Sequence, residues 1–66
     1  MTFPARLKQI RKERGFSQAK LAKISGIGAS SICGYEAGKI DPSSFAICCL
    51  ADALKVSTDY LLGRTN

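Results

Sequence analysis

Histidine and tryptophan are absent from this sequence, and aromatic residues make up only 8% of it. Histidine is the side chain that most often serves as a general base or metal ligand near neutral pH. Because no paired carboxylates and no activated cysteine setting replace it, we expect neither an enzyme nor a cofactor. With so few aromatic residues, the core must be mostly aliphatic.

Long apolar runs are also absent. The first residues, MTFPARLKQIRKERG, lack the apolar segment of a signal peptide. No stretch approaches the roughly 20 apolar residues of a membrane span. We therefore expect a cytoplasmic protein with no membrane partner.

The three cysteines, Cys33, Cys48 and Cys49, do not form a disulfide framework. Two of them are adjacent, and no pair has the Cys-x-x-Cys spacing. A zinc site would have to be built from three scattered thiols, because there is no histidine to complete it. The sequence therefore favours reduced, structural cysteines and no bound metal.

What the sequence does contain is a short, basic chain. Its 66 residues allow one domain, which we expect to stand alone over residues 1–66, without room for a catalytic cleft. Ten lysines and arginines against five aspartates and glutamates give a net charge of +5. This charge favours nucleic acid or an anionic membrane as a partner, but it could equally serve only to keep the protein soluble.

Apolar residues follow helical spacing along the whole chain, and no stretch alternates as a strand would. Serines suited to N-caps precede several of these segments, and glycines suited to helix exits follow them. The predicted fold class is all-α, a compact bundle of five helices. The helices should span about 4–14, 18–25 after Ser17, 28–37, a segment from Ser43 or Ser44 through Leu54, and 58–62 after Ser57.

Residues 18–37 carry the sharpest pattern, two helices joined by a short turn around Gly26. Such a pair is a helix-turn-helix unit. Ala22 is small enough for the two helices to cross closely. The apolar residues that should tie the pair to the other helices are Leu21, Ile27, Ile32 and Tyr35.

Several motifs stand in fixed order along the chain. They are Arg6-Leu7-Lys8-x-x-Arg11, Gly15-Phe16-Ser17-Gln18-x-x-Leu21-Ala22, Gly26-Ile27, Ile32, Tyr35-Glu36-x-Gly38-Lys39, Pro42-Ser43 and Leu50-Ala51-x-x-Leu54-x-Val56-Ser57-x-Asp59-x-Leu61-Leu62. With these motifs the chain resembles the Xre group of lambda-repressor-like and Cro-like domains, from about residue 6 to residue 63. The resemblance implies a sequence-specific, DNA-binding transcription regulator, a repressor of phage or mobile-element type that binds double-stranded DNA as a dimer.

The resemblance also implies contacts with the DNA backbone. Ser17 and Gln18 stand at the start of the second helix, where free amides and the helix dipole favour a phosphate. The Lys39 side chain and the amides around Gly38 match a second phosphate contact. Two further residues, Arg11 and Glu36, match a buried ion pair that joins the first helix to the end of the third.

The positions that match base-facing residues of the third helix are Gly28, Ala29, Ser30 and Gly34. The family usually has long polar side chains there, so this chain departs from the pattern. Ala29 can touch a thymine methyl group and Ser30 can bond several base edges, but neither offers a bidentate pattern. Either readout depends on close approach, water and DNA shape, or sequence specificity is low.

A second apolar stripe on the fourth helix, Phe45 and Cys49, lies away from the face that should enter the core. We expect it to form a two-fold dimer interface together with Tyr60, Leu61 and Leu62. In the alternative, Phe45 folds back over its own core.

A second function remains open beside DNA binding. The bare third helix would also suit a protein-interaction module that keeps the fold but has lost DNA readout. The basic first helix, Gln18 and Lys39 argue against it.

Overall fold

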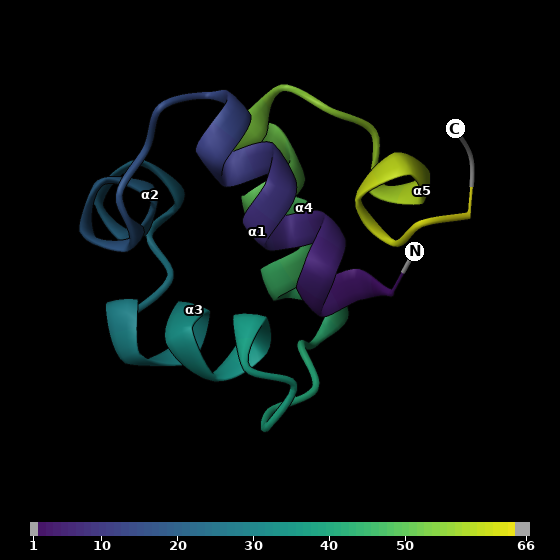
Figure 1. The fold of residues 1–66 in the computed structure, drawn as a ribbon, viewed down its shortest axis with the longest axis horizontal. Coiled ribbons are helices and arrows are strands. Elements are labelled where there is room, and N and C mark those ends of the chain that lie inside the picture. Colours follow the sequence, from purple (N-terminus) through teal and green to yellow (C-terminus); the bar gives the residue numbers. More distant parts are fainter. Residues whose placement is uncertain (1, 65–66) are drawn as a thin grey trace.

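The computed structural model describes residues 2–64, and in that range all regular structure is helical. The five α-helices are α1 (Phe3–Glu13), α2 (Gln18–Ser25), α3 (Ala29–Glu36), α4 (Ser44–Leu54) and α5 (Thr58–Leu61). In Figure 1, α1 and α4 cross at the centre of the view, with α2 and α3 to the left and α5 to the right. Helix α2 packs against α3 and α4, α1 against α3 and α5, and α4 against α5. The predicted all-α fold of five helices is confirmed.

Serine hydroxyls fix the start of three helices. Ser17, Ser43 and Ser57 each accept a hydrogen bond from the amide three residues later, at 3.0, 3.1 and 3.0 Å. Each bond satisfies an amide that has no carbonyl partner within its helix, which contributes about 1 kcal/mol to stability. The predicted caps are confirmed, and Ser43 rather than Ser44 caps α4.

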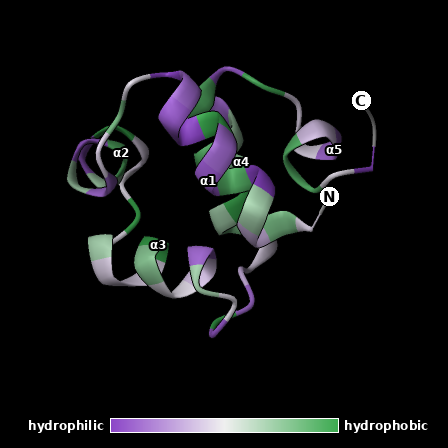
Figure 2. Ribbon diagram, in the orientation of Figure 1, coloured by the Kyte–Doolittle hydropathy of each residue, from purple (hydrophilic) through white to green (hydrophobic). Residues whose placement is uncertain are grey.

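The core is aliphatic, as predicted, and all five helices contribute to it. Helix α4 is hydrophobic along much of its length (Figure 2). Tyr35 is the aromatic residue among the buried side chains of the described range. The fully buried large side chains are Leu7, Ile10, Leu21, Ile32, Leu50, Leu54 and Leu61.

Leu61 corrects one prediction. Its side chain is fully buried in the core of its own chain, where α5 packs against α1 and α4. A side chain without exposed surface cannot contact a second copy, so the prediction that Leu61 lies at a dimer interface is wrong.

Candidate nucleic-acid interface

The turn between α2 and α3 is built around a left-handed glycine. Gly26 has φ +75°, a conformation that side chains other than glycine rarely adopt. Its amide donates to the Ala22 carbonyl at 3.0 Å, and the Ile27 amide donates to Ser25 Oγ at 3.2 Å. These bonds close the end of α2 and lead the chain directly into α3. The predicted helix-turn-helix unit is therefore present.

An ion pair joins α1 to the end of α3, as the resemblance implied. Arg11 Nε and Nη2 donate to the two carboxylate oxygens of Glu36 at 2.6 and 3.0 Å. The side chains are only 10% and 5% exposed. Arg11 Nη1 also donates to the Phe16 carbonyl at 2.8 Å. One guanidinium thus fixes α3 and the loop that leads into α2.

Gln18 belongs to the same network, which sequence reasoning missed. Its Nε2 donates to Glu36 Oε1 at 3.1 Å. Burial by itself would raise the pKa of Glu36, but the hydrogen bonds from Arg11 and Gln18 and the positive charges of Arg11 and Lys8 outweigh it and lower the pKa. Gln18 therefore couples the first turn of α2 to α3, in addition to its expected role toward a phosphate.

The residues expected to contact phosphates differ in whether their hydrogen-bond donors are still free. Ser17 is exposed at the first turn of α2, and its capping oxygen leaves the hydroxyl proton available to donate. The amides of Gly38 and Lys39 already donate to the carbonyls of Tyr35 and Gly34, at 3.1 and 2.9 Å. These bonds close the end of α3, so the predicted phosphate contact through the Gly38 amide is not supported. The Lys39 side chain is exposed, so its ammonium group can still contact a phosphate.

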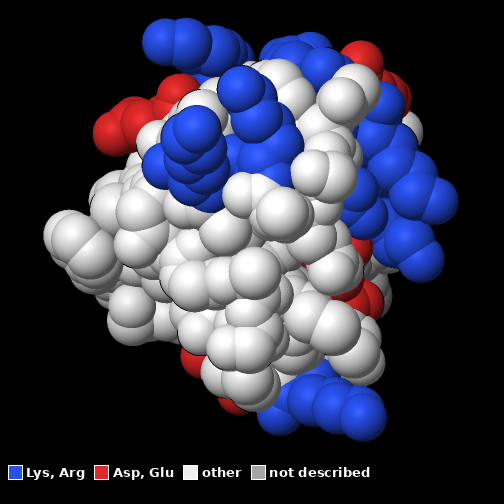
Figure 3. Space-filling view, turned by 90° about the vertical axis from the view of Figure 1, so that its left-hand side faces the viewer, with Lys and Arg blue, Asp and Glu red and all other residues white. Residues whose placement is uncertain are grey.

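Positive charge borders the face formed by α2 and α3. Figure 3 shows lysine and arginine side chains above and to one side of this face, with a further group at the bottom, around an uncharged centre. Helix α3 carries no charged side chain before Glu36. An uncharged helix bordered by cations suits a DNA groove whose edges are phosphates. The exposed lysines on α1, on α2 and after α3 are Lys8, Lys12, Lys20, Lys23 and Lys39.

The outer surface of α3 consists of small side chains. Gly28, Ala29 and Ser30 are exposed at its start, as the prediction requires. Cys33 is exposed one turn further along, and sequence reasoning did not place it there. It lies in a shallow hollow with Gln18 and the lysines of α1. Cys33 is three residues after the exposed Ser30 and therefore lies on the same side of the helix. The helical spacing in the sequence could have predicted its exposure.

Gly34 is not a free base-facing position. It is half-buried, because the side chain of Ile40 lies over it. The backbone also folds back at this point, since the amides of Lys39 and Ile40 both donate to the Gly34 carbonyl. Ile40 therefore lies between Gly34 and part of the solvent, and the predicted approach of Gly34 itself to a base is not supported. A glycine stands here because the loop after α3 occupies the space of its side chain.

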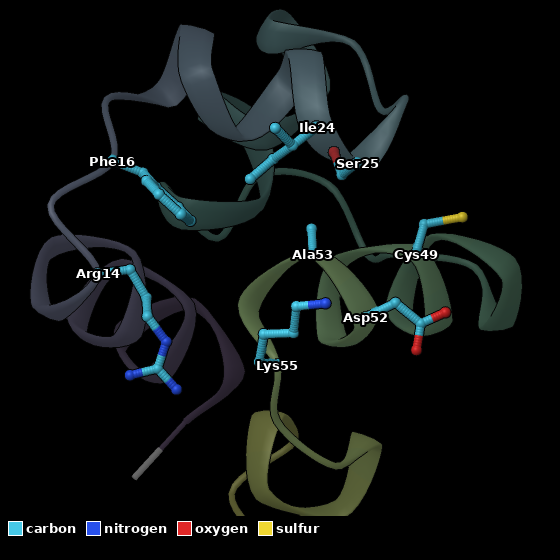
Figure 4. Close-up of a pocket in the computed structure, with 8 residues that line it drawn as sticks. All are labelled: Arg14, Phe16, Ile24, Ser25, Cys49, Asp52, Ala53 and Lys55. Atoms are coloured by element: carbon cyan, nitrogen blue, oxygen red, sulfur yellow. The ribbon is translucent and has the colours of Figure 1, made fainter.

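The expected dimer residues are divided between two sides of α4. Phe45 is 75% exposed, so the alternative that it folds over its own core is wrong. Cys49 lines a groove between α2 and α4 (Figure 4). Leu62 lines a separate hollow with Cys48 on the α5 side. Tyr60 is half-buried beneath the Arg6 guanidinium, which lies 4.4 Å from the centre of its ring.

The cysteines are free thiols, as predicted, but the expectation that they are structural is not supported. Cys33 and Cys48 are exposed and Cys49 is half-buried, so none belongs to the core. Among residues 2–64, no three cysteine, aspartate or glutamate side chains come together as a metal site. Over the same range, no helix is both long and apolar enough to cross a bilayer.

A left-handed turn between two short helices, the second exposed and bordered by lysines, defines a helix-turn-helix domain. The chain belongs to the helix-turn-helix family, whose model matches residues 7–61. This match confirms the family prediction. A curated relative is an HTH-type transcriptional regulator, and the expectation that the chain is no enzyme agrees with that.

Two solved structures match almost the whole chain. The restriction-modification controller protein C.AhdI from Aeromonas hydrophila is 37% identical with a TM-score of 0.87, and the match covers 89% of each chain. The P22 c2 repressor, solved in complex with a synthetic operator, is 29% identical with a TM-score of 0.90, and the match covers 98% of each chain.

A curated relative is longer than this chain. The SPbeta prophage-derived HTH-type transcriptional regulator YonR of Bacillus subtilis is 39% identical over 97% of this chain but only 59% of its own length. The chain spans between 50% and 59% of the length of the curated relatives it matches.

Proposed function

We propose that this chain is the operator-binding domain of a transcriptional repressor of phage or mobile-element type, acting in the cytoplasm. The observation that carries the proposal is the uncharged, exposed start of α3, bordered by exposed lysines. In this proposal α3 enters the major groove with Gly28, Ala29 and Ser30 toward base edges. The P22 c2 repressor, of similar fold, was solved with a synthetic operator, which supports the same partner here.

Three side chains hold the DNA backbone in this proposal. Ser17 and Gln18 meet one phosphate at the first turn of α2, where helical amides have no partner within the helix. Lys39 meets a second phosphate after α3. Gln18 can bond a phosphate through its remaining amide hydrogen while it keeps its bond to Glu36.

The proposal includes a two-fold dimer, because one domain reads only a half-site. Two recognition helices must lie about 34 Å apart, one turn of DNA. Phe45, with 75% of its surface exposed, is the strongest apolar anchor for a second copy. Cys49 and Leu62, on the two flanks of α4, and the exposed edge of Tyr60 would complete the interface.

Selection of bound sequences from a random duplex pool tests the DNA-binding proposal. We expect enrichment of a two-fold symmetric motif. A flat outcome would instead favour a protein-interaction module, which the small side chains of α3 would also suit.

Sedimentation tests the dimer separately. At micromolar concentration the wild type should run as a dimer and Phe45→Lys as a monomer that binds one half-site weakly. Ala29→Lys is a matched control, because Ala29 is also exposed but lies at the start of α3, away from Phe45 and Cys49. If the wild type and Phe45→Lys both run as monomers, the proposed interface is wrong.

A further inference from the structure

The outer face of α3 contains a position that is covered although it has no side chain. Ser30 and Gly34 are four residues apart and therefore lie in line on one face of the helix. That face is turned away from Ile32 and Tyr35, which enter the core. Ser30 is exposed, whereas Gly34 is half-buried. A neighbouring group must therefore cover Gly34.

The covering group is the side chain of Ile40, from the loop that follows α3. A Cβ added to Gly34 would overlap Ile40 Cδ1 and would lie 2.8 Å from Cγ1 and 3.4 Å from Cβ. Ile40 thus fills the space that a side chain at position 34 would take. Two backbone bonds keep it there, because the amides of Lys39 and Ile40 donate to the Gly34 carbonyl at 2.9 and 3.3 Å.

Only part of the Ile40 side chain is buried by this packing. It remains 47% exposed, although it is a large aliphatic residue in a loop. The side chain lies against Gly34, on the face of α3 that also carries Ser30, and Ile40 directly follows Lys39 in the chain. An apolar group at this place has one natural counterpart in the major groove of DNA, the C5-methyl group of thymine.

We propose that Ile40 is a specificity-determining residue that contacts a thymine methyl group from its place over Gly34. Gly34 is then a positioning residue, because a larger residue would push Ile40 off the helix. The inference depends on the proposed function, in which this face of α3 enters the major groove. It also accounts for the absence of a long polar side chain at position 34, since the loop supplies the group that meets the base.

The test uses the operator obtained by selection, with each thymine of the half-site replaced in turn by deoxyuridine, which lacks only the methyl group. Affinity is measured by fluorescence anisotropy. At one thymine of each half-site the replacement should weaken wild-type binding by about fourfold, the value of one buried methyl group. For Ile40→Ala, the thymine and deoxyuridine duplexes should bind equally well.

Two further variants guard against a trivial result. Ile40→Val keeps the β-branched shape and removes only Cδ1, so it should fold normally and still lose most of the methyl effect. Ile24→Ala removes an equally exposed isoleucine that lines the groove between α2 and α4 (Figure 4), and it should keep the full effect.

The outcomes separate this inference from the function on which it depends. If Ile40→Ala and Ile40→Val show the wild-type penalty at every thymine, another residue reads the methyl group and the inference is overturned. It is equally overturned if no thymine of the half-site matters to the wild type, or if the half-site contains none. A selection without any enriched motif would refute the proposed readout itself, and the role of Ile40 with it.

Discussion

Helices α3 and α4 both contribute to the core, but different forces hold them in place. Helix α4 has five buried residues, and α3 has two, Ile32 and Tyr35. The end of α3 is held instead by bonds from Arg11 and Gln18 to Glu36. Apolar burial fixes a helix without strong directional preference, whereas hydrogen bonds fix its position to within tenths of an ångström. The helix that we expect to read DNA is thus the one positioned by directional contacts.

The largest loss of stability should come from a change in the apolar packing of α4. Leu50 on α4 is fully buried. Leu50→Ala should lower the free energy of unfolding by roughly 2–5 kcal/mol, because it removes buried surface and leaves a cavity. Urea denaturation measures the loss. Asp52→Ala, an exposed change on the same helix, should stay within about 0.5 kcal/mol of the wild type.

The ion pair that holds the end of α3 should be nearly as sensitive to mutation as the apolar packing of α4. Arg11→Met should cost about 3 kcal/mol, because Glu36 would remain buried without its counter-charge. Lys12→Met changes the neighbouring exposed residue in the same way and should have little effect. Equal melting temperatures for Arg11→Met and the wild type would show that the ion pair does not hold α3.

Acid should weaken the polar contacts at the end of α3 and leave the apolar packing of α4 unchanged. The pKa of Glu36 is lower in the folded chain than in the unfolded chain, so its charge stabilises the fold above the usual glutamate range. This contribution is lost as the pH falls through the lowered pKa. Unfolding followed between neutral and strongly acidic pH should therefore show a weaker acid dependence for Glu36→Gln, which should be less stable than the wild type at neutral pH and approach it in strong acid. Glu13→Gln, at an exposed site on α1, should keep the wild-type acid dependence.

The smallest effect should leave the fold unchanged and appear only with DNA. Lys39→Gln should bind all duplexes more weakly and reduce the slope of log affinity against log salt by about 0.9, the value of one phosphate contact. Lys55→Gln is the control, since Lys55 ends α4. An unchanged slope for Lys39→Gln would exclude Lys39 as a phosphate contact.

Local signals predicted the fold well, because the helices have apolar faces at helical spacing and three of the five are capped by a serine. Ser17 and Gly26 show this, since each satisfies backbone groups within a few residues of itself. Contacts between distant residues were less predictable. Leu61 enters the core only because α5 packs on α1 and α4, and Ile40 covers Gly34 only because the loop folds back. No periodicity along the chain encodes either contact.

A nuclear magnetic resonance titration of the labelled chain with the selected operator tests the central claim most directly. If α3 is the helix that reads DNA, the largest amide shifts should fall on Gly28, Ala29, Ser30 and the loop around Lys39. The amides of α5, Thr58–Leu61, should move least. Largest shifts on α5, with α3 unchanged, would contradict the account.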